Sequence, residues 1–182
     1  MKKILPLFIV PAALVQLAPL HAQLTGTSLN VGSGNSFDST SYSVMIGLGN
    51  SSSSSFTSAV IGSNNNSISG ITDSLVVGSY NSVSSNNVAP MIVAGQNNDI
   101  TFYNGGFAFG TGLAANSSNV ALTLFGQYNT DTSNSDALFV IGNGSDPSNR
   151  HNALEVYQNG DINIPSGNLT ISGTIQVNGQ SV

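Results

Sequence analysis

Residues 58–85 read SAVIGSNNNSISGITDSLVVGSYNSVSS, and this stretch decides the fold. It holds two copies of one unit, in which three apolar residues precede a glycine and an asparagine follows three positions later. Gly admits positive φ, and Asn tolerates left-handed backbone and bonds its own main chain, so both are typical of a chain that leaves a strand and turns. Each copy therefore predicts a strand, a turn, a short second strand and another turn.

The same unit recurs eight times between residues 29 and 145. Its glycines are Gly32, Gly47, Gly62, Gly78, Gly95, Gly110, Gly126 and Gly142, at intervals of 15, 15, 16, 17, 15, 16 and 16 residues. Six units carry the asparagine, at Asn35, Asn50, Asn65, Asn81, Asn98 and Asn129. This period is too short for a βαβ unit but fits one coil of a narrow solenoid, whose strands stack about 4.8 Å apart. We predict an all-β chain, with about eight parallel coils over residues 29–145 and the glycines in one column.

The apolar triplets predict which side chains fill the coil. Because strand side chains alternate, the residues one and three positions before the glycine share one face, and the middle residue points the other way. We expect the first set, with Ile46, Ile61, Val77, Phe109 and Ile141, to fill the interior. The middle set is Met45, Val60, Val76, Val93, Leu124 and Val140. That set would form an exposed apolar stripe, and a second copy of the stripe is the simplest partner to cover it.

The first 22 residues have the pattern of a secretory signal. Lys2 and Lys3 precede an apolar run, and Leu20-His21-Ala22 ends it with a small residue, so we expect cleavage after Ala22. An uncleaved anchor helix is the alternative, but Pro6, Pro11 and Pro19 interrupt a run that is short for a bilayer span. The expected division is a signal peptide over 1–22, solenoid repeats over 23–146 and a C-terminal stalk or cap over 147–182.

Charge and composition exclude several partners. Beyond residue 22 the chain has eight acidic residues and Arg150 as its only basic residue, a net charge of −7 with His neutral. One arginine cannot neutralise a run of phosphates, so nucleic acid is excluded, and an anionic membrane finds no basic patch. The chain has no cysteine for disulfides, and only 6% of its residues are charged. Regular apolar clusters argue against disorder, so stability must come from packing or association.

The units "SAVIGSNNNSIS" and "SLVVGSYNSVSS" resemble the head repeats of trimeric autotransporter adhesins, the YadA-like heads. The resemblance covers about residues 29–145. It implies a left-handed parallel β-roll, with three rolls packed side by side through an apolar face. The coiled-coil stalk and membrane barrel of that family have no counterpart in this sequence.

Residues 138–179 resemble modules of bacterial surface proteins and phage tail fibres. In "LFVIGNGSDPSNRHNALEVYQNGDINIPSGNLTISGTIQVNG", a GNG…NAL motif precedes short strands that are apolar on one face only. The resemblance implies a trimeric stalk in which three chains cover these faces around one axis. A monomeric meander that closes over the last coil is the alternative, and Asn159-Gly160 is a good hairpin signal for it.

Candidate chemical sites are few, and we expect no catalytic, cofactor or metal site. His151 is the only histidine beyond residue 22, and no G-x-S-x-G motif surrounds any serine. Asp131, Asp136 and Asp146 could offer oxygen ligands to Ca²⁺, but their spacing matches no known loop, and solvated turn residues are the simpler interpretation.

Several aromatic residues lie late in the repeats. We expect Phe107, Phe109, Phe125 and Phe139 to occupy core positions of wider coils, while Tyr103 and Tyr128 at turns could stack on sugars.

The sequence therefore predicts an exported, non-enzymatic adhesive or structural protein of a bacterial cell surface, forming a homotrimer that offers a multivalent surface to a host protein or glycan. The alternative is a self-assembling extracellular filament or coat subunit whose only ligand is itself. An ice-binding solenoid is disfavoured, because no regular Thr-x-Thr array occurs.

Overall fold

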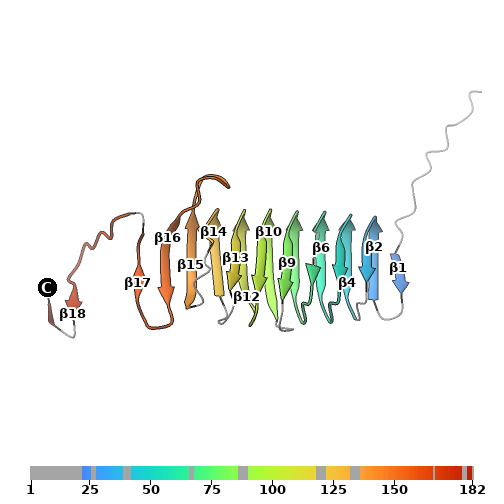
Figure 1. The fold of residues 1–182 in the computed structure, drawn as a ribbon, viewed down its shortest axis with the longest axis horizontal. Helices are drawn as coiled ribbons and strands as arrows, with labels where there is room; N and C mark the ends of the chain where they lie inside the picture. The colour runs from blue at the N-terminus through green and yellow to red at the C-terminus, as the bar shows by residue number, and fades with distance from the viewer. Residues whose placement is uncertain are drawn as a thin grey trace, which may run out of the picture.

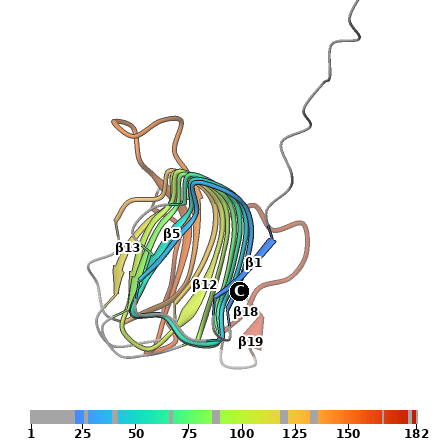
Figure 2. The ribbon, with the colours of Figure 1, turned by 90° about the vertical axis from the view of Figure 1, so that its right-hand side faces the viewer.

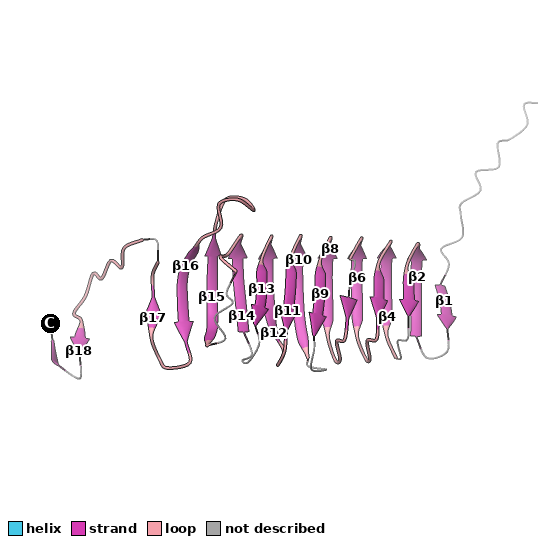
Figure 3. Ribbon diagram, viewed as in Figure 1, coloured by secondary structure: helices cyan, strands magenta, loops and turns pink. Residues whose placement is uncertain are grey.

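The described part of the computed structural model is all-β. It comprises residues 22–25, 28–38, 42–65, 68–85, 90–117, 122–131, 136–165, 167–177 and 180–181. Within these residues the chain forms strands and loops and no helix (Figure 3). Two stacked sheets enclose one core as a β-solenoid, which confirms the predicted fold class. The predicted signal segment lies outside the described residues, except for Ala22.

Eleven strands form the long sheet along the rod (Figure 1). In spatial order they are β1 (Ala22–Thr25), β2 (Ser28–Ser33), β4 (Val44–Leu48), β6 (Ala59–Ser63), β8 (Leu75–Ser79), β10 (Met91–Gln96), β12 (Gly106–Thr111), β14 (Leu122–Gln127), β15 (Ala137–Asn143), β16 (Asn152–Tyr157) and β17 (Ile162–Asn163). Neighbours from β2 to β15 pair in parallel, as stacked coils require.

The opposite wall is the short sheet. Figure 2, which looks along the rod, shows its strands β5 and β13 across from β12 of the long sheet. Its strands are β3 (Ser36–Asp38), β5 (Ser51–Ser53), β7 (Ile68–Ser69), β9 (Ser82–Ser85), β11 (Asp99–Phe102) and β13 (Ala114–Ser117), all paired in parallel. A separate hairpin joins β18 (Gln176–Val177) to β19 (Gln180–Ser181). Among the described residues, six of the eight repeats thus have a strand in both walls.

The repeat glycines stand in one column, as predicted. Each pairs with the next across the long sheet, from Gly32 with Gly47 to Gly126 with Gly142. From Gly32 to Gly126 they have positive φ, and a Cβ on any of them would lie 1.7–2.1 Å from the next glycine's carbonyl oxygen. No other residue fits these positions, because the coils approach too closely there.

The asparagines bind that same carbonyl. The Nδ2 groups of Asn35, Asn50, Asn65, Asn81 and Asn98 each donate to the glycine carbonyl of the following coil at 3.0–3.1 Å. We call these five residues the Asn ladder. From Asn50 onward, each member also donates from Nδ2 to the Oδ1 atom of the member before it, at 2.9–3.1 Å. The ladder stops at Leu113, whose backbone N–H donates to Asn98 Oδ1 at 2.9 Å.

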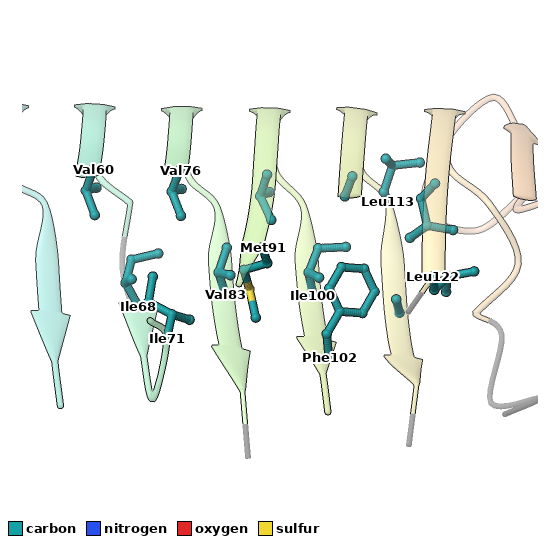
Figure 4. Close-up of a cluster of buried hydrophobic side chains, with 14 of the residues drawn as sticks. Val60, Ile68, Ile71, Val76, Val83, Met91, Ile100, Phe102, Leu113 and Leu122 are labelled. Atoms are coloured by element: carbon teal, nitrogen blue, oxygen red, sulfur yellow. The ribbon is translucent and has the colours of Figure 1, made fainter. Parts of the chain in front are cut away.

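The predicted assignment of the two strand faces is wrong. The middle residues Met45, Val60, Val76, Val93, Leu124 and Val140 are buried within the single chain, not arranged as an exposed stripe. Figure 4 shows Val60 and Val76 in one cluster with Ile68, Val83 and Ile100 of the short sheet. The expected interior residues Ile46, Ile61, Val77, Phe109 and Ile141 instead lie exposed or half-buried on the outside.

The corner of the coil explains why the middle residues, and not the flanking ones, point inward. Alternation places each glycine on the same side of the strand as the middle residue. That side turns inward at the corner, where the asparagine side chain occupies the space: a Cβ on Gly47 would lie 3.2 Å from Asn50 Nδ2. The middle residue therefore points into the core, and the two flanking apolar residues point out.

Antiparallel strands finish both ends of the long sheet. β1 pairs with β2, β16 with β15, and β17 with β16 (Figure 1). Gly160, with φ +92°, forms the turn between β16 and β17, in agreement with the Asn159-Gly160 hairpin signal. This part of the chain therefore has the form of the meander alternative. Ile162, Leu169, Ile171 and Ile175 are exposed.

Two glycines with positive φ give a matched test of the column. Gly78→Ala would place a Cβ 1.9 Å from the carbonyl oxygen of Gly95, whereas a Cβ on Gly160 meets nothing within 4 Å. We expect Gly78→Ala to lower the free energy of unfolding by about 3 kcal/mol or more, and Gly160→Ala by about 1 kcal/mol from φ strain alone. Urea unfolding followed by circular dichroism measures both values, and equal losses would contradict the role of the column.

Candidate functional site

The outward side of the long sheet carries a row of apolar side chains along the described chain. It consists of the residues one and three positions before each repeat glycine, and we call it the outer face. Its members are Leu29, Val31, Val44, Ile46, Ala59, Ile61, Leu75, Val77, Ile92, Ala94, Phe107, Phe109, Thr123, Phe125, Phe139 and Ile141, of which only Thr123 is polar. Ile61 is 37% exposed, Phe125 40% and Phe107 44%. Soluble monomers rarely leave such a large contiguous apolar patch open.

Aromatic rings stack along the C-terminal part of the outer face. The ring centroids of Phe109 and Phe125 lie 5.3 Å apart at an interplanar angle of 14°, and those of Phe125 and Phe139 lie 5.9 Å apart. The expectation that these phenylalanines, with Phe107, fill wider coils is therefore wrong. Among the late phenylalanines in the described residues, only Phe102 is a fully buried core residue.

The outward side of the short sheet has the opposite character. Among the side chains that the structure describes there, most are polar, including Ser51, Ser84, Asp99, Thr101 and Asn116, and Ala114 is an apolar exception. Ser84 and Thr101 on neighbouring strands share a hydrogen bond of 2.9 Å. The solenoid thus has one apolar wall and one polar wall, and the apolar wall is the candidate site of interaction.

Arg150 closes the C-terminal end of the coil stack. Its Nη1 group donates to the carbonyl oxygens of Gly112 at 2.7 Å and of Asn129 at 3.1 Å, and its guanidinium lies 5.9 Å from the ring centroid of Tyr128. These contacts begin where the Asn ladder stops, at Leu113. The only basic residue beyond residue 22 therefore satisfies main-chain carbonyls at the end of the stack.

The loop 144–151 contains two of the predicted candidate residues and projects beyond the neighbouring strands (Figure 1). His151 is exposed in this loop, and its backbone N–H donates to the carbonyl of Tyr128 at 3.0 Å. Asp146 accepts hydrogen bonds from Asn149, Ser148 and Ser145, which together hold the pKa of its carboxyl below the usual value.

The remaining candidates lie apart from this loop. Asp136 lies beside the hairpin of β16 and β17, and its carbonyl accepts from the backbone N–H of Gln158 at 2.8 Å. Asp131 is exposed. Within the described ranges, no three His, Cys, Asp or Glu residues come close enough to hold a metal ion. Tyr103 is half-buried, and the Tyr128 ring packs over Gly112.

Glu155 is the most connected acidic residue of the C-terminal cap. Burial opposes its ionisation, but its carboxylate accepts hydrogen bonds from the Tyr157 hydroxyl, from Asn152 Nδ2 at 2.7 Å and from Asn163 Nδ2 at 3.1 Å. These bonds outweigh burial and lower the pKa of Glu155 below its usual value. The network joins β16 to β17 and so holds the cap together. Neither the spacing nor the composition of the sequence signalled it.

Two concavities open on the described surface. One, of about 530 Å³, is lined by Asp136, Tyr157, Gln158, Asn159 and Asp161 at the C-terminal cap. The other, of about 270 Å³, lies near the starts of β10 and β12, at the margin of the outer face. The second is mainly apolar, and it is lined by Asp73, Pro90, Met91, Ile92, Asn104, Gly106 and Phe107.

Comparisons with known proteins identify no relative. No family model matches the chain, and neither does any curated protein or solved structure. In the part of the chain that the structure describes, no helix is long and apolar enough to cross a membrane.

The Glu155 network predicts a pH-dependent cap. Because the folded-state pKa of Glu155 is depressed, its carboxylate adds stability above its unfolded value near 4.5, and that stability is lost as the pH falls through the folded value. The hydrogen-exchange protection factors of the β16 and β17 amides, which already allow for the pH dependence of the intrinsic rate, should therefore fall relative to those of β8 as the pH drops below 4.5. Glu155→Gln should weaken protection at neutral pH and flatten this dependence. An unchanged pH profile in Glu155→Gln would contradict the assignment.

Proposed function

We propose that the protein is an exported structural or adhesive surface protein, whose solenoid self-associates through the outer face and presents a multivalent surface. The observation that carries the proposal is the outer face itself, an apolar band along the eight parallel strands from β2 to β15 that includes exposed Leu29, Ile61 and Phe125. A rod that keeps this band in water would expose a row of large apolar side chains. Association removes them from water, at about 25 cal/mol for each Å² of apolar surface buried.

A homotrimer is the assembly that we propose. The resemblance of the repeats to YadA-like heads supports it, because those rolls pack in threes through an apolar face. Ile162, Leu169, Ile171 and Ile175 are exposed in the C-terminal segment and would form a second contact around the same axis. Three linked rolls bind a ligand-bearing surface with higher avidity than one, because the second and third contacts are intramolecular. The polar outward side of the short sheet would then face solvent and partners.

A self-assembling filament is the alternative, and the ends of the sheets bear on it. Head-to-tail stacking needs open strand edges at both ends of the rod. The long sheet ends instead in β1 and in the two-residue strand β17, both antiparallel to their neighbours. Short antiparallel end strands are a poor template for another parallel coil, which favours discrete rods. Electron microscopy of residues 23–182 distinguishes short rods from long fibres.

Three aspartate substitutions test association through the outer face. Ile61→Asp would place a carboxylate in the proposed dry interface, so we expect the oligomer to dissociate while β-content is kept. Val76→Asp would place it in the core, where Val76 is 0% exposed, so we expect loss of the fold itself. Ser51→Asp lies on the short sheet in the column that already holds Asp99 and should be silent. Light scattering reports the mass of each variant, and circular dichroism its β-content.

Three results would count against the proposal. One is a wild-type monomer at micromolar concentration. Another is an Ile61→Asp variant that keeps the full wild-type mass. Loss of mass in Ser51→Asp would also count against the proposal, because that position lies on the wall opposite the outer face.

A further inference from the structure

The concavity at the margin of the outer face lies where the repeat departs most from its period. The step from Gly78 to Gly95 is 17 residues, the longest of the seven. Met91 and Ile92 open β10 with Pro90 directly before them, and Gly106 and Phe107 open β12 beside them. The concavity lies between these two strand starts and the turn at Asp73, and its volume is about 270 Å³. That volume fits a single six-membered ring with its substituents.

One part of the wall is apolar and includes an aromatic ring. Phe107 is 44% exposed, and Met91 supplies a buried floor. Gly106 contributes only backbone, since a Cβ there would lie 2.7 Å from the Phe102 ring and 2.4 Å from the carbonyl of Leu122. An occupant with a face of C–H groups would pack against Phe107 and Ile92 and exclude water from both.

The rim is polar and carries no positive charge. Asp73 and Asn104 supply a carboxylate and a carboxamide. One carboxylate oxygen of Asp73 accepts a hydrogen bond from Thr57 Oγ1, which holds the Asp73 side chain in place. The backbone of Asp73 is left-handed, with a φ of +51°. A carboxylate accepts about four hydrogen bonds, so Asp73 keeps acceptor capacity for an occupant that donates hydroxyl groups.

We propose that this concavity binds one ring of a neutral saccharide. A sugar ring offers what the wall requires, with a C–H face for Phe107 and Ile92 and hydroxyl donors for Asp73. An apolar side chain from a second copy would bury the Asp73 carboxylate without donors, which is costly. An anionic sugar would meet Asp73 with no basic residue in the lining to offset it. The inference rests on the proposed adhesive function and names the class of ligand for it. It requires that self-association leave Ile92 and Phe107, at the margin of the outer face, open to the ligand.

Saturation-transfer NMR and calorimetric titration of residues 23–182 test the site. The probes are the methyl glycosides of glucose, galactose, mannose, N-acetylglucosamine and N-acetylgalactosamine, with sialic acid as the anionic comparison. At least one neutral glycoside should bind, and sialic acid should not. Asp73→Asn keeps the acceptor for Thr57 but removes the charge, and Phe107→Ala removes the aromatic wall. Each should weaken binding about tenfold or more, as expected for the loss of a charged hydrogen bond or a ring contact.

Matched controls lie outside the concavity. Tyr80→Ala removes an exposed ring that lies outside both the outer face and the concavity, and Asp99→Asn removes an exposed carboxylate of the short sheet; both should bind as wild type. The site is rejected if no neutral glycoside binds at tens of millimolar, if sialic acid binds equally well, or if the two site variants bind like the controls. Light scattering on the same samples keeps the two proposals separate. Binding by a monomer would support the site and reject the assembly, and an oligomer that binds no glycoside would do the reverse.

Discussion

The contact between successive repeat glycines is the constraint on which the whole structure depends. From Gly47 to Gly110, each glycine carbonyl lies close to where the Cβ of the preceding glycine would be, and it accepts a hydrogen bond from the asparagine of the preceding coil. The close approach of the glycines and the asparagine hydrogen bond therefore depend on each other. The missing Cβ lets the coils approach, and the amide satisfies a carbonyl that would otherwise be buried without a partner. Because each amide of the Asn ladder also bonds the next one, the chain of dipoles strengthens along the stack.

The glycine and asparagine contacts at the corner also limit the space inside the coil, and so determine how many apolar side chains remain on the surface. The asparagines occupy one corner of the interior, so the strands of the two walls lie close together there. In most coils the long sheet contributes one apolar side chain at the centre, such as Val76, and the short sheet contributes one opposite, such as Val83. The two remaining apolar residues of each triplet have no place inside. A core this narrow leaves much of the chain's apolar content on the outer face, and only 6% of all residues are charged to offset it.

The fold could be predicted from the sequence because its determinants are local and periodic. The glycine intervals gave the stacked coils and the single column, and Asn159-Gly160 gave the hairpin at the C-terminal cap. The alternation of side chains could not show which residues of each triplet point into the core, since a period of two separates two faces without indicating which face is inside. A signal did exist in the lone apolar residue after the asparagine, such as Ile68 or Val83. One residue on the short wall matches one residue on the long wall, which is the middle one.

The features outside that prediction arise where the repeat is broken. Leu113 interrupts the Asn ladder, and the arginine of a loop 37 positions further along the sequence then supplies donors to Gly112 and Asn129. The concavity with an aromatic wall lies beside the starts of β10 and β12, next to the 17-residue step of the repeat. The Glu155 network forms only after the chain reverses into antiparallel strands. Regular coils repeat one surface, so the features that distinguish one coil from the next lie where the repeat is broken. The proposed association accordingly rests on the regular coils, and the proposed recognition site lies beside the longest step of the repeat, at the margin of the outer face.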